Sequence, residues 1–235
     1  DEASQVKPVD ALGALVRANQ AVVVGDDHQL PPTSFFDAIT QADEEDESDM
    51  TSDIESILGL FRSQGANQSM LRWHYRSRHQ SLIAVSNHEF YKDKLVVFPS
   101  PDGDSRTLGL VYNYVADGAY DRGRSRRNEK EASVVAEAVM DHAREQLTKP
   151  ASEQHTLGVA AFSMAQMDAI LDHLERLRRR DDSCEDYFRG HPHEPFFVKN
   201  LENVQGDERD VIFISVGYGR TAEGYIAMDF GPVNR

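Results

Sequence analysis

Two short stretches near the amino terminus hold residue types that suit phosphate chemistry. The adjacent carboxylates Asp1 and Glu2 are followed by the run AVVVGDDHQLPP at 21–32. Carboxylates are ligands that Mg²⁺ prefers, and a second carboxylate can orient a water for attack on a phosphoryl group. An apolar run that ends in Gly25-Asp26 and continues to Gln29 and two prolines is typical of a buried strand that turns into a rigid loop. Together the two stretches predict a nucleotide-phosphate site.

The elements that must position these residues alternate between helix and strand. Apolar periodicity and cap residues predict helices over 6–19, 53–61, 78–90, 128–147 and 165–179, and strands over 21–25, 69–73, 108–115, 157–162, 196–198 and 211–216. Asp53 is the expected N-cap of the second helix, and Ser163 is a candidate cap for the last one. Such alternation indicates an α/β fold with parallel sheets flanked by helices, which binds ligands at the carboxyl ends of its strands.

The net charge of -15 does not exclude nucleic acid, because much of the acid is concentrated in one segment. Six of the seven residues of 43–49 are carboxylates, and we expect this run to be a mobile insertion away from the catalytic surface. Local patches decide phosphate contacts. Arginines cluster at 72–78, 122–127 and 176–180. We interpret the last cluster as a solvated helix end that complements the helix dipole.

Other composition features narrow the class of protein. No apolar stretch approaches the roughly 20 residues that span a membrane, so we expect no membrane association. The single cysteine, Cys184, excludes an internal disulfide framework and is compatible with a reducing cytoplasm, where we expect the protein to be located. Cys184, His191 and His193 lack the paired spacing of a zinc site, which disfavours a metal there.

Four sequence blocks resemble motifs of the superfamily 1 DNA and RNA helicases. Asp1-Glu2 resembles motif II and the run at 25–32 resembles motif III. The block LRWHYRS at 71–77 resembles motif IV, and its continuation to Leu95 is similar to the 1B branch that contains the RNA-surveillance helicases and senataxin. The block NVQGDE at 203–208, followed by a hydrophobic strand, resembles motif V. The segment 158–166 resembles the strand-to-helix unit before motif V, and all the blocks occur in the family's order.

The resemblance implies two RecA-like lobes of the P-loop NTPase type. Residues 1–66 would form the carboxyl-terminal part of the first lobe and residues 67–235 most of the second, with a boundary near the turn at 65–67. The sequence contains no Gly-Lys pair of a phosphate-binding loop and no motif VI. We therefore expect a segment of a larger motor, dependent on other portions of the same polypeptide and inactive toward ATP by itself.

The resemblance also implies roles for residues of the first lobe. ATP and Mg²⁺ would be the cofactors, with Asp1 as a metal ligand and Asp26 in support of the metal shell. Glu2 would be the general base for the attacking water, and Gln29 would sense the γ-phosphate. Hydrolysis between the lobes would drive movement along a single strand of DNA or RNA and unwinding at a duplex junction.

Further roles fall to the second lobe. Arg76 would stabilise charge in the transition state, and Tyr75 would stack on the adenine. Glu208 would bind the ribose, next to Gly206, which permits close backbone approach to a ligand. Residues 203–205, which are Asn203, Val204 and Gln205, would approach the nucleic-acid backbone, although Val204 replaces a small hydroxyl residue that the family often has nearby.

Two other classes of function are open to this sequence. One is a catalytically inactive RecA-like scaffold that binds nucleic acid or protein. The intact Asp1-Glu2 pair, Gln29 and Arg76 favour the enzyme, because a retired site has no chemical need for them. The other is an ATPase attached to a nuclease, but no nuclease motif is visible in the sequence.

Overall fold

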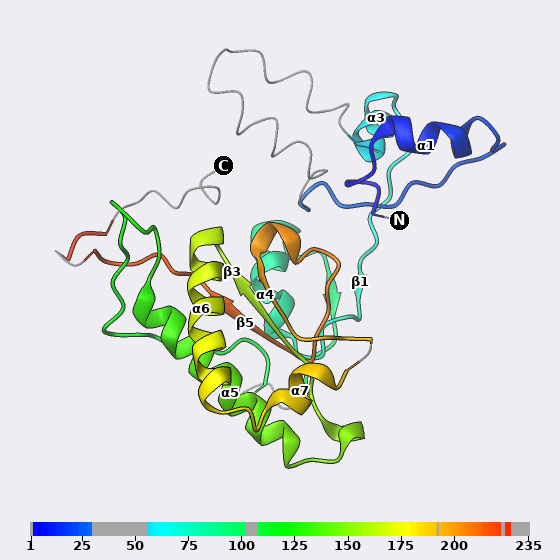
Figure 1. The fold of residues 1–235 in the computed structure, drawn as a ribbon. Coiled ribbons are helices and arrows are strands. Elements are labelled where there is room, and N and C mark those ends of the chain that lie inside the picture. Colours follow the sequence, from blue (N-terminus) through cyan, green and yellow to red (C-terminus); the bar gives the residue numbers. More distant parts are fainter. Residues whose placement is uncertain (1, 30–55, 102–107, 192, 222–223, 227–235) are drawn as a thin grey trace. The chain divides into compact units, whose positions relative to one another are not determined.

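The computed structural model describes residues 2–29, 56–101, 108–191, 193–221 and 224–226 (Figure 1). It divides into two compact units, Asp1–Asn113 and Tyr114–Arg235. Asp1, Asp53 and the acidic run at 43–49 lie outside the described residues. The assignment of 1–66 and 67–235 to two lobes stays a prediction, since the units divide at a later position.

The first unit contains short elements. Its helices are α1 (Pro8–Leu15), α3 (Ile57–Ser63) and α4 (Ser81–Glu89), and its strands are β1 (Trp73–His74) and β2 (Val96–Val97). The two strands pair in parallel, with Trp73 opposite Val96, and the ring of Trp73 stacks on that of Phe98 at 5.6 Å. Ser56 caps α3 by accepting a hydrogen bond from Gly59 N at 3.1 Å. Gly65 ends that helix in a turn at φ 73°, as the sequence predicted.

Helix predictions were better than strand predictions in this part of the chain. The helices expected over 6–19 and 78–90 are confirmed over shorter ranges. The strands expected over 21–25 and 108–115 are wrong, since neither range is a strand in its described residues. Val22 is 80% exposed and Tyr112 is 83% exposed. A run of β-branched and aromatic residues becomes a strand only where a neighbour pairs with it, and these runs have no ladder here.

The second unit is built on a parallel sheet. In chain order it contains α5 (Glu129–Leu147), η2 (Ala151–Glu153), β3 (Leu157–Ala161), α6 (Met164–Arg180), α7 (Glu185–Arg189), β4 (Phe197–Asn200), η3 (Leu201–Asn203) and β5 (Val211–Ser215). The strand order is β4-β3-β5, and every pairing is parallel. Val159 on the central strand lies opposite both Val198 and Phe213. This arrangement confirms the predicted α/β class, and β3, β4 and β5 lie close to their expected ranges.

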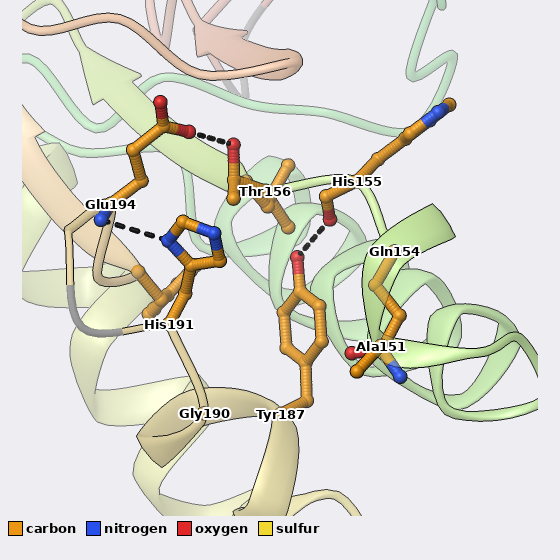
Figure 2. Close-up of a pocket in the computed structure, with 10 residues that line it drawn as sticks. Ala151, Gln154, His155, Thr156, Tyr187, Gly190, His191 and Glu194 are labelled. Carbon is orange, nitrogen blue, oxygen red and sulfur yellow. Dashed lines mark hydrogen bonds between the residues drawn. The ribbon is translucent and has the colours of Figure 1, made fainter.

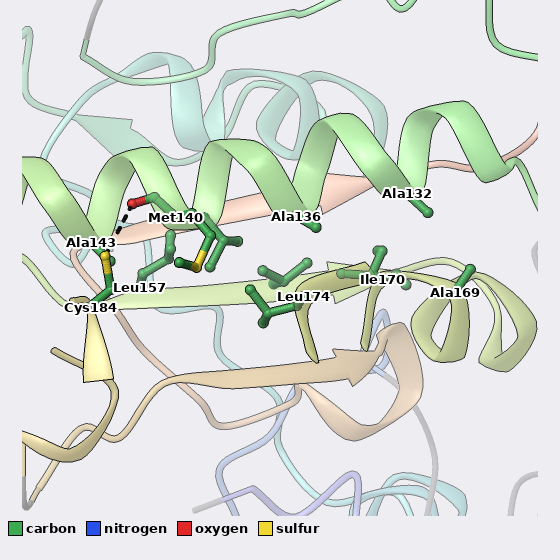
Figure 3. Close-up of a cluster of buried hydrophobic side chains, with 12 residues drawn as sticks. Ala132, Ala136, Met140, Ala143, Leu157, Ala169, Ile170, Leu174 and Cys184 are labelled. Atoms are coloured by element: carbon green, nitrogen blue, oxygen red, sulfur yellow. Dashed lines mark hydrogen bonds between the residues drawn. The ribbon is translucent and has the colours of Figure 1, made fainter. Parts of the chain in front are cut away.

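The core of this unit is formed where α5 and α6 cover the central strand (Figure 3). Buried alanines on α5, at 132, 136 and 143, let the helix approach closely, and Ile170 and Leu174 of α6 fill the space against Leu157 of β3. Cys184 packs at the edge of this cluster and is 1% exposed. The described residues contain no group of three metal-ligating side chains, and none of their helices is long and apolar enough to cross a membrane.

Side-chain caps fix where the two long helices begin. Asn128 Oδ1 accepts a hydrogen bond from Glu131 N at 3.1 Å at the start of α5. Ser163 Oγ accepts one from Gln166 N at 3.2 Å at the start of α6, so the candidate cap is confirmed. Because α6 follows β3 directly, its first turn lies at the carboxyl end of that strand.

Candidate functional site

The backbone directly after Glu2 lies beside the start of the turn at 25–29, the run that resembles motif III. Ala3 N donates a hydrogen bond to Val24 O at 2.9 Å. A Cβ atom added to Gly25 would lie 2.9 Å from Ser4 N and 3.1 Å from a methyl group of Leu58. Only glycine therefore permits this approach of the two backbones. Glu2 precedes the contact, is exposed, and has a left-handed backbone with φ 55°.

Asp26 organises the turn that carries Gln29. Its Oδ1 accepts a hydrogen bond from His28 N at 3.0 Å, and its backbone carbonyl accepts one from Gln29 N at 3.2 Å. Its Oδ2 accepts a hydrogen bond from the hydroxyl of Tyr91. Burial, together with this bond and the charge of Asp26, raises the pKa of Tyr91 to about 12. The phenol is therefore neutral and remains a donor at any physiological pH.

Further contacts hold the same turn in place. The ring of His28 lies 5.6 Å from the rings of both Phe90 and Tyr91, measured between centroids. Asp27 forms an ion pair with Arg62 of α3. Sequence reasoning missed these partners, because nothing in a local motif links residue 26 to residue 91.

Tyr75 and Arg76, of the block that resembles motif IV, lie on a bend directly after β1. His74 Nε2 lies 2.7 Å from Ser77 Oγ and accepts a hydrogen bond from Ser77 N at 3.3 Å. These contacts close the backbone around Tyr75 and Arg76. Both side chains are exposed, Tyr75 by 86%. A planar ring and an adjacent guanidinium are thus presented together on one turn.

The motif V residues follow β4 in the second unit. Asn203 ends η3, and Asp207 N donates to Val204 O at 2.9 Å to close a turn through Gln205 and Gly206. Gly206 has φ 85° with open space where a side chain would begin, so its conformation, and not its packing, requires glycine. Lys199 Nζ contacts Asp207 Oδ2 at 2.5 Å and ties the turn to β4. Glu208, two residues after Gly206, is exposed.

A buried polar network lies at the carboxyl ends of β3 and β5. Gln166 Nε2 donates to Ser215 Oγ at 3.1 Å, and Ser215 Oγ donates to Glu131 Oε1 at 2.7 Å. The same carboxylate oxygen accepts a hydrogen bond from Gly217 N at 2.9 Å. Gln166 also bonds Asn128 at 2.8 Å. The network joins the starts of α5 and α6 to the end of the sheet where ligands bind in folds of this class.

Sequence reasoning did not identify this network as a unit. The helix expected over 128–147 begins at Asn128, and Gln166 closes the block at 158–166 that resembles a family segment. Those two signals named two of its members. Ser215 and Gly217 carry no local signal that relates them to the other residues.

A small cavity lies at the opposite end of the sheet and is too small to hold a nucleotide (Figure 2). Its volume is about 60 Å³, and it lies at the start of β3. Thr156 Oγ1 donates to Glu194 Oε2 at 2.7 Å, and His191 Nδ1 accepts from Glu194 N at 2.9 Å. Tyr187 donates from its hydroxyl to His155 O at 2.9 Å. The cavity has room for only a few water molecules, and its polar groups bond to one another.

Comparison with known proteins defines the class. Residues 54–225 match the AAA domain family AAA_12, and the chain belongs to that family. Its mixed helices and parallel strands are consistent with the RecA-like, P-loop NTPase-type fold.

Two curated relatives align with the whole chain. One is the "Uncharacterized ATP-dependent helicase MG140" of Mycoplasma genitalium, which is 33% identical over 249 residues. The other is the "Uncharacterized ATP-dependent helicase MG140 homolog" of Mycoplasma pneumoniae, which is 32% identical over 249 residues. Each alignment covers 100% of this chain and 20% of the relative. The chain thus spans about one fifth of the length of these relatives.

Proposed function

We propose that the chain is part of an ATP-dependent nucleic-acid helicase of superfamily 1B, spanning motifs II to V. The observation that carries the proposal is the hydrogen bond between Ala3 and Val24, together with the close approach at Gly25. These contacts are made by the backbone directly after Glu2 with the turn at 25–29, and a shared phosphate site would require such an approach. The family match and the names of both relatives support the same class.

In this proposal the first unit carries the hydrolytic groups. Glu2 accepts the proton of the attacking water, and Gln29 contacts the γ-phosphate. Bound ATP and Mg²⁺ supply the phosphoryl group and the cation that offsets its charge. The carboxylates of Asp1, Glu2 and Asp26 suit this hard cation. Both oxygens of Asp26 accept hydrogen bonds, so its part in the metal shell is to orient a ligand or a water.

The remaining roles concern charge stabilisation and partner binding. Arg76 stabilises the transition state, Tyr75 stacks on the adenine, and Glu208 binds the ribose. The turn at 203–206 approaches the backbone of a DNA or RNA strand. The phosphate-binding loop and motif VI belong to other portions of the polypeptide, so the 235-residue chain alone does not turn over ATP. The proposed location is the cytoplasm.

The proposal is tested in the full-length protein by replacing Glu2 with Gln. E2Q should still bind ATP, while turnover stimulated by a single strand falls at least about a hundredfold through loss of the general base. The matched control is E89Q, which makes the same change at another exposed glutamate of the first unit. Turnover by E2Q at the wild-type rate would remove Glu2 from the role of general base, and a full-length wild type without turnover would favour the inactive scaffold.

A further inference from the structure

A short loop before α5 concentrates positive charge in a chain of net charge -15. Residues 121–127, here called the arginine loop, hold four arginines and a single carboxylate. The proposed catalytic and strand-binding residues do not include any of them. Binding to phosphates depends on local positive charge and not on the net charge of the chain. The positive charge of the arginine loop is concentrated enough for such binding.

The arginine loop has a fixed shape. Asp121 N donates to Arg127 O at 3.0 Å, and Arg126 N donates to Asp121 O at 2.8 Å, which closes its neck. Asp121 Oδ2 accepts hydrogen bonds from Ser125 N at 3.0 Å and Ser125 Oγ at 2.8 Å. These bonds lower the pKa of the Asp121 carboxyl. The only carboxylate of the loop is thereby occupied in holding the loop together.

The four arginines divide into two groups. Arg127 is directed to the protein, with a guanidinium nitrogen 2.6 Å from Glu129 and another 3.8 Å from Asp172. Arg122, Arg124 and Arg126 are exposed. Arg126 has a left-handed backbone with φ 54°, where glycine or asparagine is the usual residue. The backbone conformation therefore does not favour an arginine at position 126. A ligand that binds the guanidinium group would explain why arginine is present.

The arginine loop is attached to the side of the β4-β3-β5 sheet at which the carboxyl ends of the strands lie, here called the carboxyl edge. Tyr120 N donates to Arg220 O at 2.8 Å, and its ring meets that of Tyr218 edge-on at 5.2 Å. This contact joins the loop to the segment after β5, and the two run side by side in Figure 1, in green and orange-red. At its other end Asn128 bonds Gln166, which follows β3. The motif V turn follows β4, and so belongs to this same edge.

We propose that the arginine loop binds the phosphodiester backbone of the single strand, through Arg124 and Arg126 and with Arg122 beside them. The inference rests on the proposed function in its choice of a nucleic acid as the partner. The contacts are to phosphates, so they add affinity without sequence preference. The loop and the motif V turn together form a strand-binding edge in the second unit.

The test measures binding of fluorescent single-stranded DNA and RNA to the full-length protein over a range of salt concentrations. R124A/R126A should reduce the slope of log affinity against log salt by about 1.4, because each phosphate contact on a single strand contributes roughly 0.7. The same relation predicts a roughly 25-fold loss of affinity at about 0.1 M salt. R124K/R126K keeps the charge and should retain most of the slope.

The matched control is R179A/R180A at the end of α6. It removes the same charge from exposed arginines of the same unit. That helix end lies at the opposite edge of the sheet, because α6 runs back from the carboxyl end of β3. The control should bind a strand as the wild type does. R126G suits the left-handed backbone, so it should weaken binding without lowering the thermal midpoint, which separates lost contacts from unfolding.

The outcomes separate this inference from the proposed function. If the wild type is stimulated by a strand but R124A/R126A keeps its affinity and salt slope, the inference is wrong and the helicase proposal stands. Equal losses of strand affinity in R124A/R126A and R179A/R180A would also overturn the inference. So would a result in which R124A/R126A loses affinity for ATP but keeps its affinity for the strand. A wild type that binds no strand and is stimulated by none would contradict the proposed function.

Discussion

The side chain of Gln166 bonds both backbone groups of Asn128. Its Oε1 accepts from Asn128 N at 2.8 Å, and its Nε2 donates to Asn128 O at 3.3 Å. The side-chain amide thus offers one acceptor and one donor to the backbone of Asn128, as a residue of a neighbouring β-strand would. Because Gln166 is 1% exposed, these groups have no access to bulk water, and the pair fixes the start of α5 against the start of α6.

Replacing Gln166 with Leu should destabilise the second unit by roughly 2–4 kcal/mol. The leucine keeps the size of the side chain but leaves the buried N–H of Asn128 unpaired, at about 1–3 kcal/mol. It also removes the bonds from Gln166 Nε2 to Asn128 O and Ser215 Oγ, at about 0.5–1.5 kcal/mol each, although Asn128 O keeps its bond from Ala132 N at 3.0 Å. Urea denaturation of the chain measures the change. Q154L is the control, since Gln154 is only partly buried and donates to Lys149 O at 3.1 Å. Similar midpoints for Q166L and the wild type would show that the pair contributes little to stability.

A second prediction concerns the pH dependence of stability. Burial lowers the pKa of His142, against the smaller opposing effect of its contact with the carbonyl of His155. The folded state therefore binds a proton less readily than the unfolded state, whose histidine has the usual pKa of 6.5. The contribution of neutral His142 to the stability of the fold is fully present above pH 6.5. It is lost as the pH falls from 6.5 through the lower pKa that His142 has in the folded state.

The measurement is the free energy of unfolding as a function of pH. H142F keeps an aromatic ring against Tyr187 and Phe213, whose centroids lie 5.7 Å and 6.2 Å from that of His142. It should show a weaker loss of stability below pH 6.5 than the wild type. H193F, at an exposed position, should keep the wild-type dependence. Parallel curves for H142F and the wild type would assign the pH dependence to other groups.

The sequence predicted those parts of the fold that have local causes. The helices after Asn128 and Ser163 were predictable because each has a cap residue followed by apolar spacing over several turns. The range 21–25 has an equally apolar pattern but is not a strand, because strand formation depends on a partner elsewhere in the chain.

The candidate site likewise has features with local causes, which were predictable, and features that depend on distant residues, which were not. The motif blocks were recognisable from residue types and order, and their roles stay predictions. The bonds that hold them were not recognisable, since Tyr91 is 65 positions from Asp26 and Gln166 is 38 positions from Asn128. Pairings over such separations follow from the packing of whole elements, which no local pattern encodes.

The contact at Gly25 gives a third prediction. G25A should destabilise the first unit by about 1–3 kcal/mol, because the new methyl group would meet Ser4 N at 2.9 Å and force the two segments apart. G13A is the matched control. Gly13 is in α1 with open space around it, and alanine there should stabilise by roughly 0.5–1 kcal/mol. Chemical denaturation of both variants measures the difference, and equal effects would mean that the backbones do not approach closely at Gly25.

The last prediction separates the charge of Arg76 from its shape. In the full-length protein, R76A should lower strand-stimulated ATP turnover by about a thousandfold, as expected for an arginine that stabilises charge on a transferring phosphoryl group. R76K should recover little of this loss, because lysine has no planar fork of donors. R72A changes another exposed arginine just before β1 and should leave turnover near the wild-type rate. ATP affinity, measured separately, should change far less than turnover in R76A, because the contact strengthens in the transition state. Recovery by R76K would mean that the site needs only a positive charge, and wild-type turnover in R76A would remove Arg76 from the catalytic groups.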